Sequence, residues 1–202
     1  MNKLFQKSTA LLILLVLAIT STGFKSNIGR SVTDFSLRNT DGKLVSTADY
    51  KAAKGFIIIF TCNHCPFAKL YAKRMNALNI KYSALNVPLV AVNSMDTLIY
   101  KEESLADMKL KVERDSLNFP YLQDAFQTVG KQFGAEHTPT AYVIWKENDQ
   151  WTIKYSGSID DNGENSQIAT PFIVLAVDEL LKGLPVSVPE TESFGCAIFY
   201  RK

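Results

Sequence analysis

Hydrophobic residues gather in short runs that predict β-strands. Residues 56–60 (FIIIF) and 89–92 (LVAV) are unbroken apolar segments rich in β-branched side chains. This pattern is typical of strands that are buried on both faces of a sheet. Residues 140–145 (TAYVIW) and 151–155 (WTIKY) predict a closing hairpin that turns around residues 147–149. The sequence therefore predicts a sheet with a deeply buried centre.

A second hairpin is predicted closer to the N-terminus. Residues 31–37 (SVTDFSL) alternate between polar and apolar side chains, and residues 43–46 (KLVS) predict a partner strand. Asp41 and Gly42 lie between them, and Asp-Gly is a strong signal for a tight hairpin turn.

Four longer segments carry the apolar spacing of helices. They are residues 67–83, 104–117, 125–133 and 171–181. In the first, we expect Leu70, Met75 and Leu78 on the inner face. In the second, Ser104 and Asp107 have the spacing of a helix cap. Strands that alternate with helices predict an α/β fold with a central, partly parallel sheet covered on both faces.

Composition and charge narrow the classes of partner. The chain has 202 residues, of which 47% are hydrophobic, a share that excludes a disordered chain. The formal net charge is +2, and Lys3 and Lys7 account for this excess. The rest of the chain is neutral and has no basic stripe, so we expect no nucleic-acid partner.

The N-terminus has the layout of an export signal. Lys3 and Lys7 precede the apolar residues 10–19 (ALLILLVLAI), and small polar residues follow. As a helix, the apolar run would cover roughly 15 Å, against about 30 Å for the bilayer hydrocarbon. We therefore predict that residues 1–23 are a signal peptide or an uncleaved N-terminal anchor. The protein is expected to be periplasmic or secreted, with membrane contact only through that segment.

The candidate chemistry lies in the sequence Cys62-Asn63-His64-Cys65-Pro66, directly after the first buried strand. Two thiols separated by two residues, where a strand leads into a helix, are typical of a redox pair. We expect Cys62 at the helix N-terminus, where the helix dipole lowers the pKa of a thiol, and Cys65 as the resolving thiol. His64 would add positive charge, and Asn63 and Pro66 would line the site.

Metal binding is the main alternative for two closely spaced cysteines. A zinc site would need two further ligands, and the candidates are His64 itself, His137 and Cys196. Thiolates also suit Cu(I), with His137 as a third ligand, so a copper chaperone of the thioredoxin fold is another alternative. We expect no metal and no cofactor in the redox function.

A Thr-Pro pair strengthens the redox interpretation. Thr138 and Pro139 stand before the strand predicted at residues 140–145. A CxxC after a buried strand, with Thr-Pro before a later strand, resembles the thioredoxin fold. That resemblance implies that the peptide bond before Pro139 is cis and that the proline lies beside the CxxC.

A narrower resemblance covers about residues 32–202. The segments DFSLRNTDGKLVSTADY, CNHCP, IDDN and PVSVPETESFGCAI resemble the peroxiredoxin-like, AhpC/TSA-related thioredoxin family. The resemblance implies one redoxin domain over residues 30–202, including the C-terminal tail. It also implies a thioredoxin-like fold in which helices flank a central mixed sheet, with an N-terminal β-hairpin extension and an inserted helix.

The expected function is thiol–disulfide exchange on protein disulfides or thiols, with a redox partner protein. The alternative is a thiol peroxidase. Peroxiredoxins carry a threonine or serine three residues before the reactive cysteine, and counting back from Cys65 places Cys62 there. Counting back from Cys62 gives Ile59, so neither alignment supplies the hydroxyl.

Two questions stay open in the sequence. Thioredoxins carry a buried acid on the strand before the CxxC, whereas residues 56–60 contain no titratable group. Water, His64 or a residue from elsewhere would have to take that role. Cys196 is either a small buried side chain in a terminal strand or a third redox cysteine that meets the CxxC when the tail folds back.

Overall fold

The computed structural model describes residues 26–202, so the predicted signal segment, residues 1–23, lies outside the described residues. The strands are β1 (Ser31–Val32), β2 (Ser36–Asn39), β3 (Leu44–Ser46), β4 (Gly55–Phe60), β5 (Leu89–Asn93), β6 (Tyr121–Gln123), β7 (His137–Thr138), β8 (Thr140–Glu147), β9 (Gln150–Gly157) and β10 (Cys196–Ala197). The helices are η1 (Thr47–Asp49), α2 (Pro66–Lys69), α3 (Ala72–Ser83), η2 (Lys101–Glu103), α4 (Leu105–Asp115), α5 (Thr128–Phe133) and α6 (Phe172–Leu181). Within this described part, no helix combines the length and apolar character needed to cross a bilayer.

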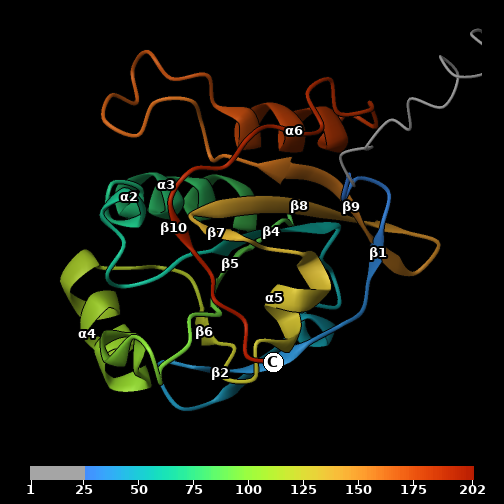
Figure 1. The fold of residues 1–202 in the computed structure, drawn as a ribbon. Helices are drawn as coiled ribbons and strands as arrows, with labels where there is room; N and C mark the ends of the chain where they lie inside the picture. Colours follow the sequence, from blue (N-terminus) through green and yellow to red (C-terminus); the bar gives the residue numbers. More distant parts are fainter. Residues whose placement is uncertain (1–25) are drawn as a thin grey trace, which may run out of the picture.

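Eight strands form one mixed sheet in the order β1-β9-β8-β4-β5-β6-β2-β3. The central strands β4, β5 and β6 are parallel, and β8 joins β4 in the antiparallel direction. Figure 1 shows helices on both sides of this curled sheet. The predicted α/β class with a mixed central sheet is confirmed.

The core lies on both faces of β4, because all six of its residues are buried. Ile57 and Ile59 pack on the side of α3 and α6, whereas Phe56, Ile58 and Phe60 pack on the side of α5. Alternation of side chains along a strand sends successive residues to opposite faces. The prediction that residues 56–60 form a strand buried on both faces is therefore confirmed.

The predicted N-terminal strand is divided in two. β1 pairs with β9, whereas β2 pairs with β3 and β6. Between them, Asp34 Oδ1 accepts hydrogen bonds from Thr47 Oγ1 at 2.6 Å and from Trp151 Nε1 at 2.8 Å. These bonds hold the chain in a turn from one edge of the sheet to the other. The hairpin formed by β2 and β3 is confirmed, with Gly42 in the left-handed region at its turn.

The predicted helix over residues 67–83 is also divided, into α2 and α3. Tyr71 turns inward at the break, and its hydroxyl donates to Asp160 Oδ1 at 3.1 Å. Met75 and Leu78 are buried as expected, but the prediction for Leu70 is wrong, because its side chain is 47% exposed.

The connection between β5 and β6 contains η2 and α4, which form the expected inserted helix. Ser104 caps α4 by accepting a hydrogen bond from the backbone N–H of Asp107 at 3.2 Å. This connection brings η2 to the ends of β4 and β5, where the predicted site begins. A separate pair of short strands, β7 and β10, lies at the same end.

Candidate functional site

Cys62 and Cys65 lie in the turn between β4 and α2, and both side chains are fully buried. Thr138 contacts the two sulfurs. Its Oγ1 lies 3.1 Å from Cys62 Sγ, and its carbonyl oxygen lies 3.2 Å from Cys65 Sγ. The Thr138–Pro139 peptide bond is cis, as the resemblance implied. The structure therefore brings together residues that are more than 70 positions apart in sequence.

The expectation that Cys62 occupies the helix start is wrong. α2 begins at Pro66, and Cys65 is its N-cap residue. Proline is favoured at the first helical position because its missing N–H would have no partner there. The unpaired N–H groups of α2 therefore lie next to Cys65, and the backbone N–H of Ala68 helps to lower the pKa of Cys65.

The two thiols have opposite acidities. A hydrogen bond from the Cys62 thiol lowers the pKa of Cys65 to about 4, against the opposing effect of burial. The same bond and burial raise the pKa of Cys62 above its ordinary value. The carbonyl oxygen of Thr138 favours the protonated form of Cys65, but the thiol and the backbone N–H of Cys196 act in the opposite direction. Cys65 is therefore the thiol that ionises first.

Glu103 is a residue of this site that the sequence interpretation missed. Its side chain is buried, and its carboxylate accepts hydrogen bonds from the backbone N–H groups of Asn63 and His64 at 2.8–3.0 Å. It also accepts a bond of 2.6 Å from Asn93 Nδ2. Its negative charge adds to the rise in the pKa of Cys62. Glu103 is thus a buried acid from elsewhere in the chain that lies close to Cys62, whereas residues 56–60 contain none.

His64 and Asn63 are held by the groups around them. His64 Nδ1 lies 2.7 Å from Glu103 Oε1, and the imidazole ring stacks on Tyr100 with 4.5 Å between the ring centroids. Asn63 Oδ1 accepts a hydrogen bond of 3.1 Å from the hydroxyl of Tyr121. A positive charge on His64 would therefore be offset by Glu103 before it could act on either thiol.

Metal-ligating groups also gather here. One ligand atom from each of Cys62, His64 and Glu103 lies within 4.8 Å of the other two. However, the carboxylate and the imidazole nitrogen already bond to each other, and the carboxylate is filled by backbone donors. His137, the proposed third copper ligand, lies on β7 opposite Ala197. The arrangement is better suited to holding the CxxC turn than to coordinating an ion.

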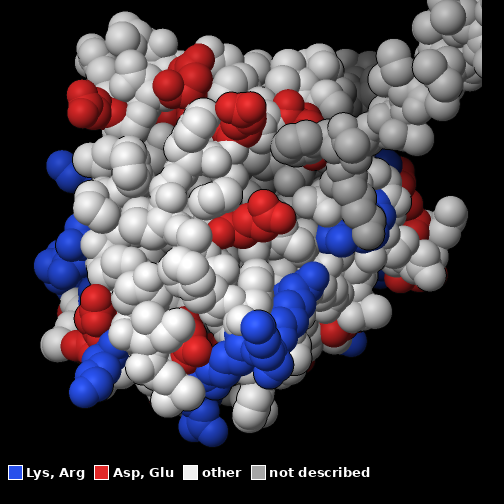
Figure 2. All heavy atoms as spheres, viewed as in Figure 1, with Lys and Arg blue, Asp and Glu red and all other residues white. Residues whose placement is uncertain are grey.

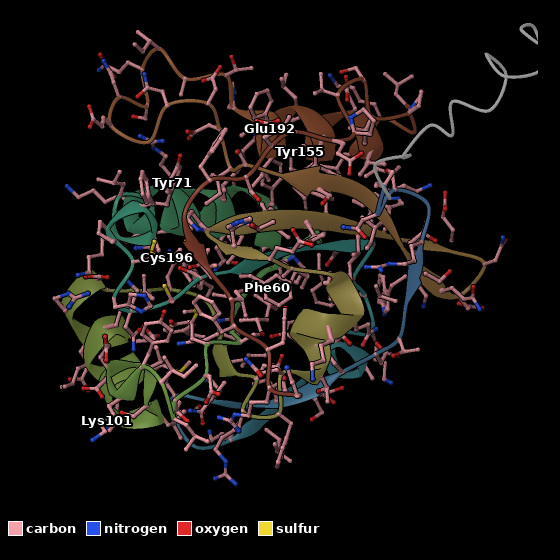
Figure 3. The ribbon with its side chains drawn as sticks, in the orientation of Figure 1. Phe60, Tyr71, Lys101, Tyr155, Glu192 and Cys196 are labelled. Atoms are coloured by element: carbon pink, nitrogen blue, oxygen red, sulfur yellow. The ribbon has the colours of Figure 1, made fainter. Side chains whose placement is uncertain are left out.

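Cys196 lies beside the CxxC pair. It belongs to β10, which pairs antiparallel with β7 so that Cys196 stands opposite Thr138. Figure 3 shows Cys196 on the part of the chain that crosses the site. Burial, and then a hydrogen bond with Cys65, raise the pKa of Cys196 to about 11. Unlike Cys62 and Cys65, Cys196 keeps part of its surface exposed.

A hollow of about 470 Å³ lies next to Pro139. Phe67 of α2, Leu70 directly after α2 and Phe194 from the chain before β10 supply exposed apolar side chains to its walls. Figure 2 shows that the surface over α2 and the neighbouring chain is largely uncharged. Pro66 is exposed at the start of α2. Proteins seldom expose adjoining large apolar side chains except where something binds.

The fold and the site define the class of this protein. A mixed sheet with helices on both faces, a CxxC turn after a central strand and a cis-proline beside it make this a thioredoxin-fold redoxin. The model of the AhpC/TSA family matches residues 28–155. The chain belongs to this family.

Solved structures agree with this assignment. A hypothetical protein from Sinorhizobium meliloti is 30% identical, with a TM-score of 0.79 over 88% of this chain and 96% of that chain. An uncharacterized conserved protein from Geobacillus kaustophilus is 35% identical, with a TM-score of 0.78 over 86% and 92%. A putative thiol:disulfide interchange protein DsbE from Chlorobium tepidum shares the fold at 20% identity, with a TM-score of 0.53 over 64% and 83%. No curated protein matches the sequence.

Proposed function

We propose that this redoxin is a thiol–disulfide oxidoreductase that acts on protein disulfides or thiols through Cys62 and Cys65. The observation that carries the proposal is that two buried cysteines of opposite acidity both contact one residue, Thr138. A thiolate is the attacking species in disulfide exchange, and a nearby protonated thiol is suited to resolve the mixed disulfide. The redoxin class supports a thiol-based oxidoreductase.

The reaction in the reducing direction balances within the pair. The Cys65 thiolate forms a bond to one sulfur of a substrate disulfide, and the other substrate sulfur leaves with the electron pair and takes up a proton. Cys62 then loses its proton and attacks Cys65 Sγ, which releases the second substrate thiol. Two electrons have then passed from Cys62 and Cys65 to the substrate. The reverse sequence oxidises a dithiol substrate.

The substrate class follows from the surface beside the site. Phe67, Leu70 and Phe194 offer apolar contact area next to Pro139, as an extended protein segment requires. A small charged thiol would gain little from these side chains. We therefore favour protein substrates over small-molecule thiols.

The reduction potential of the Cys62–Cys65 pair tests the proposal. A low pKa on Cys65 stabilises the reduced form, so we expect a potential above the value of about −270 mV that is typical of thioredoxin. Equilibration with glutathione, followed by mass analysis of the trapped forms, gives this value. Cys65→Ser should abolish the two-electron exchange, and Cys62→Ser should prevent formation of the Cys62–Cys65 disulfide. A pair that forms no disulfide with glutathione would contradict the proposal.

A thiol peroxidase is the second candidate, because the pKa of Cys65 is lowered to about 4 and the family model is that of AhpC/TSA. In that reaction the thiolate attacks one peroxide oxygen, which gives a sulfenic acid and water. Cys62 stands where peroxiredoxins carry the hydroxyl that orients the peroxide. We therefore expect consumption of hydrogen peroxide to be slow compared with disulfide exchange, and the two rates distinguish the candidates.

We also propose an exported location. Lys3 and Lys7, followed by the apolar residues 10–19, support a signal segment, and disulfide exchange suits an oxidising compartment. The mature chain should begin shortly after Gly23 or stay anchored by that segment. N-terminal sequencing of the native protein measures this, and an intact chain in the cytoplasmic fraction would contradict it.

A further inference from the structure

We propose that Cys196 is a third redox cysteine, carried by a C-terminal segment (residues 189–202) that binds across the site as an internal substrate strand. In this proposal, Cys196 exchanges disulfides with the external protein and passes them to Cys65. The inference rests on the proposed function of the Cys62–Cys65 pair, and it specifies how a substrate reaches two sulfurs that have no exposed surface.

The position of β10 is that of an added substrate strand. Cys196 pairs with Thr138, and the backbone N–H of Ile198 donates to the carbonyl oxygen of Glu136 at 2.8 Å. Extended peptides bind to sheet edges through such main-chain bonds. Because Thr138 also contacts Cys62 and Cys65, this register brings the third thiol to the reactive pair.

The segment is fixed on both sides of the site. On the N-terminal side of Cys196, the N–H of Thr191 donates to the carbonyl oxygen of Ser156 at 3.0 Å. After it, the buried Gln127 donates from Nε2 to the carbonyl oxygen of Phe199 at 2.8 Å and accepts from the N–H of Arg201 at 2.8 Å. Figure 1 shows the red chain crossing the face of the molecule between these two anchors. These hydrogen bonds on either side fix the position of Cys196.

Gly195 permits the close approach of this segment. Its φ is +150°, and a Cβ at this position would lie 1.9 Å from the carbonyl oxygen of Thr138. Backbone cannot give way as a flexible side chain can, so a larger residue would push β10 away from β7. The glycine is thus required where the chain delivers the neighbouring Cys196.

Exposure gives the order of the exchange steps. Cys62 and Cys65 are fully buried, whereas Cys196 is partly exposed. A large external disulfide meets Cys196 first, unless the whole segment leaves. Because the pKa of Cys196 is raised to about 11, its sulfur is protonated again once Cys62 has displaced it.

Each step conserves atoms and electrons. The Cys196 sulfur loses its proton and bonds to one sulfur of the external disulfide, and the other external sulfur leaves and is protonated. The Cys65 thiolate attacks Cys196 Sγ, so a Cys65–Cys196 disulfide forms and the second external thiol leaves. Cys62 then attacks Cys65 Sγ, a Cys62–Cys65 disulfide forms, and Cys196 regains a proton.

Trapping the middle step tests the proposal. In Cys62→Ser, which lacks the last attacking thiol, oxidation by glutathione disulfide should convert most of the protein into an intramolecular Cys65–Cys196 disulfide. Peptide mapping without reductant identifies the cross-link. The matched control adds Cys196→Ala and Ala197→Cys to this variant. It moves the thiol one residue along β10 and hence to the opposite side of the strand, so the cross-link should be lost.

The outcomes separate this inference from the proposed function. If Cys62→Ser carries glutathione on Cys65 while Cys196 stays free, the relay is wrong, although the pair still exchanges disulfides. If the native chain itself forms no Cys62–Cys65 disulfide, the proposed function is wrong as well.

A kinetic measurement covers the case in which Cys62→Ser does not fold. Cys196→Ser should slow reduction of a protein disulfide by at least about tenfold, because the intramolecular step is lost. Ser83→Ala, at an exposed position of α3 outside this segment, should leave that rate unaltered. Equal rates for Cys196→Ser and the native chain would overturn the relay.

Discussion

At the scale of single residues, the site depends on a carboxylate beside the first cysteine. Glu103 holds the backbone of Asn63 and His64 through its oxygens and so fixes the turn between the thiols. A buried charge is tolerated only where hydrogen bonds satisfy it, and this carboxylate is surrounded by donors. Glu103 is therefore a positioning residue that also acts on Cys62 through its charge.

Replacement of Glu103 by glutamine should separate these two roles. The bond with Cys65, burial and the charge of Glu103 all raise the pKa of Cys62, so loss of the charge should shift titration of Cys62 to lower pH. The glutamine amide would also place its N–H donors against the N–H donors that surround Glu103. This should lower the unfolding free energy by about 1–3 kcal/mol. Thiolate absorbance against pH and urea unfolding measure these effects. Glu102→Gln, at an exposed neighbour, is the control, and an unchanged Cys62 titration would contradict the role of the charge.

Acidity also predicts which thiol is ionised. With a pKa of about 4 for Cys65, the folded protein should contain one thiolate at about pH 6. In the fold, the pKa of Cys65 lies below the ordinary value of 9.0. The Cys65 thiolate therefore stabilises the folded state fully above pH 9.0, and this stabilisation is lost as the pH falls through about 4.

Ultraviolet absorbance of the thiolate is the measurement for this prediction. The signal should disappear in Cys65→Ser and persist in Cys62→Ser, where the serine hydroxyl still donates to Cys65. The opposite result would return the role of attacking thiol to Cys62.

At the scale of elements, the hydrophobic pattern predicted the strands and helices that depend on residues close together in the chain. The short, β-branched apolar run at residues 56–60 predicted a strand buried on both faces, and β4 forms there. The break between α2 and α3 depends on Tyr71 reaching Asp160, which is 89 positions away. Glu103 lies in the charged run KEES, which looks like an exposed helix start. It is buried because its carboxylate contacts the CxxC turn and Asn93 at the end of β5.

The contact between β4 and β8 predicts the cost of one substitution. A Cβ on Gly55 would lie 2.3 Å from Trp145 Cε3 and 2.5 Å from the carbonyl oxygen of Ile144. Gly55→Ala should therefore destabilise the fold by about 1–3 kcal/mol, as overpacked cores do. Urea unfolding measures the change. Gly163→Ala is the control, because its nearest neighbour, Leu70, has an exposed side chain that can move, and equal losses in both variants would contradict the prediction.

At the scale of the whole molecule, the family domain carries an addition. The AhpC/TSA match ends at residue 155, and α6 and the C-terminal segment follow it. The segment passes over the reactive end of the sheet and docks on α5 and its preceding residue, Gln127. Most of the family domain could be predicted from strand and helix patterns. The return of the tail could not, because its hydrogen bonds join residues that are distant in sequence.

Weakening the contact between Gln127 and the C-terminal segment should therefore expose the site without changing a cysteine. Gln127→Ala removes the hydrogen bonds to Phe199 and Arg201, worth about 2 kcal/mol together. Alkylation of Cys65 by a thiol reagent should then become about 30-fold faster. Gln132→Ala is the matched control, since Gln132 bonds to Thr33 and not to the segment. Equal alkylation rates in the two variants would show that the segment does not limit access.

The occupied edge of β7 changes what a binding measurement on this protein reports. A peptide that pairs with Thr138 must displace residues of the protein's own chain. Its apparent dissociation constant is the intrinsic one divided by the open fraction. A docking free energy of about 3 kcal/mol would hold that fraction near roughly 1% and weaken apparent affinity about 100-fold. A partner then competes with the protein's own C-terminal segment for the edge of β7. A partner that also binds Cys196 gains an advantage over one that does not.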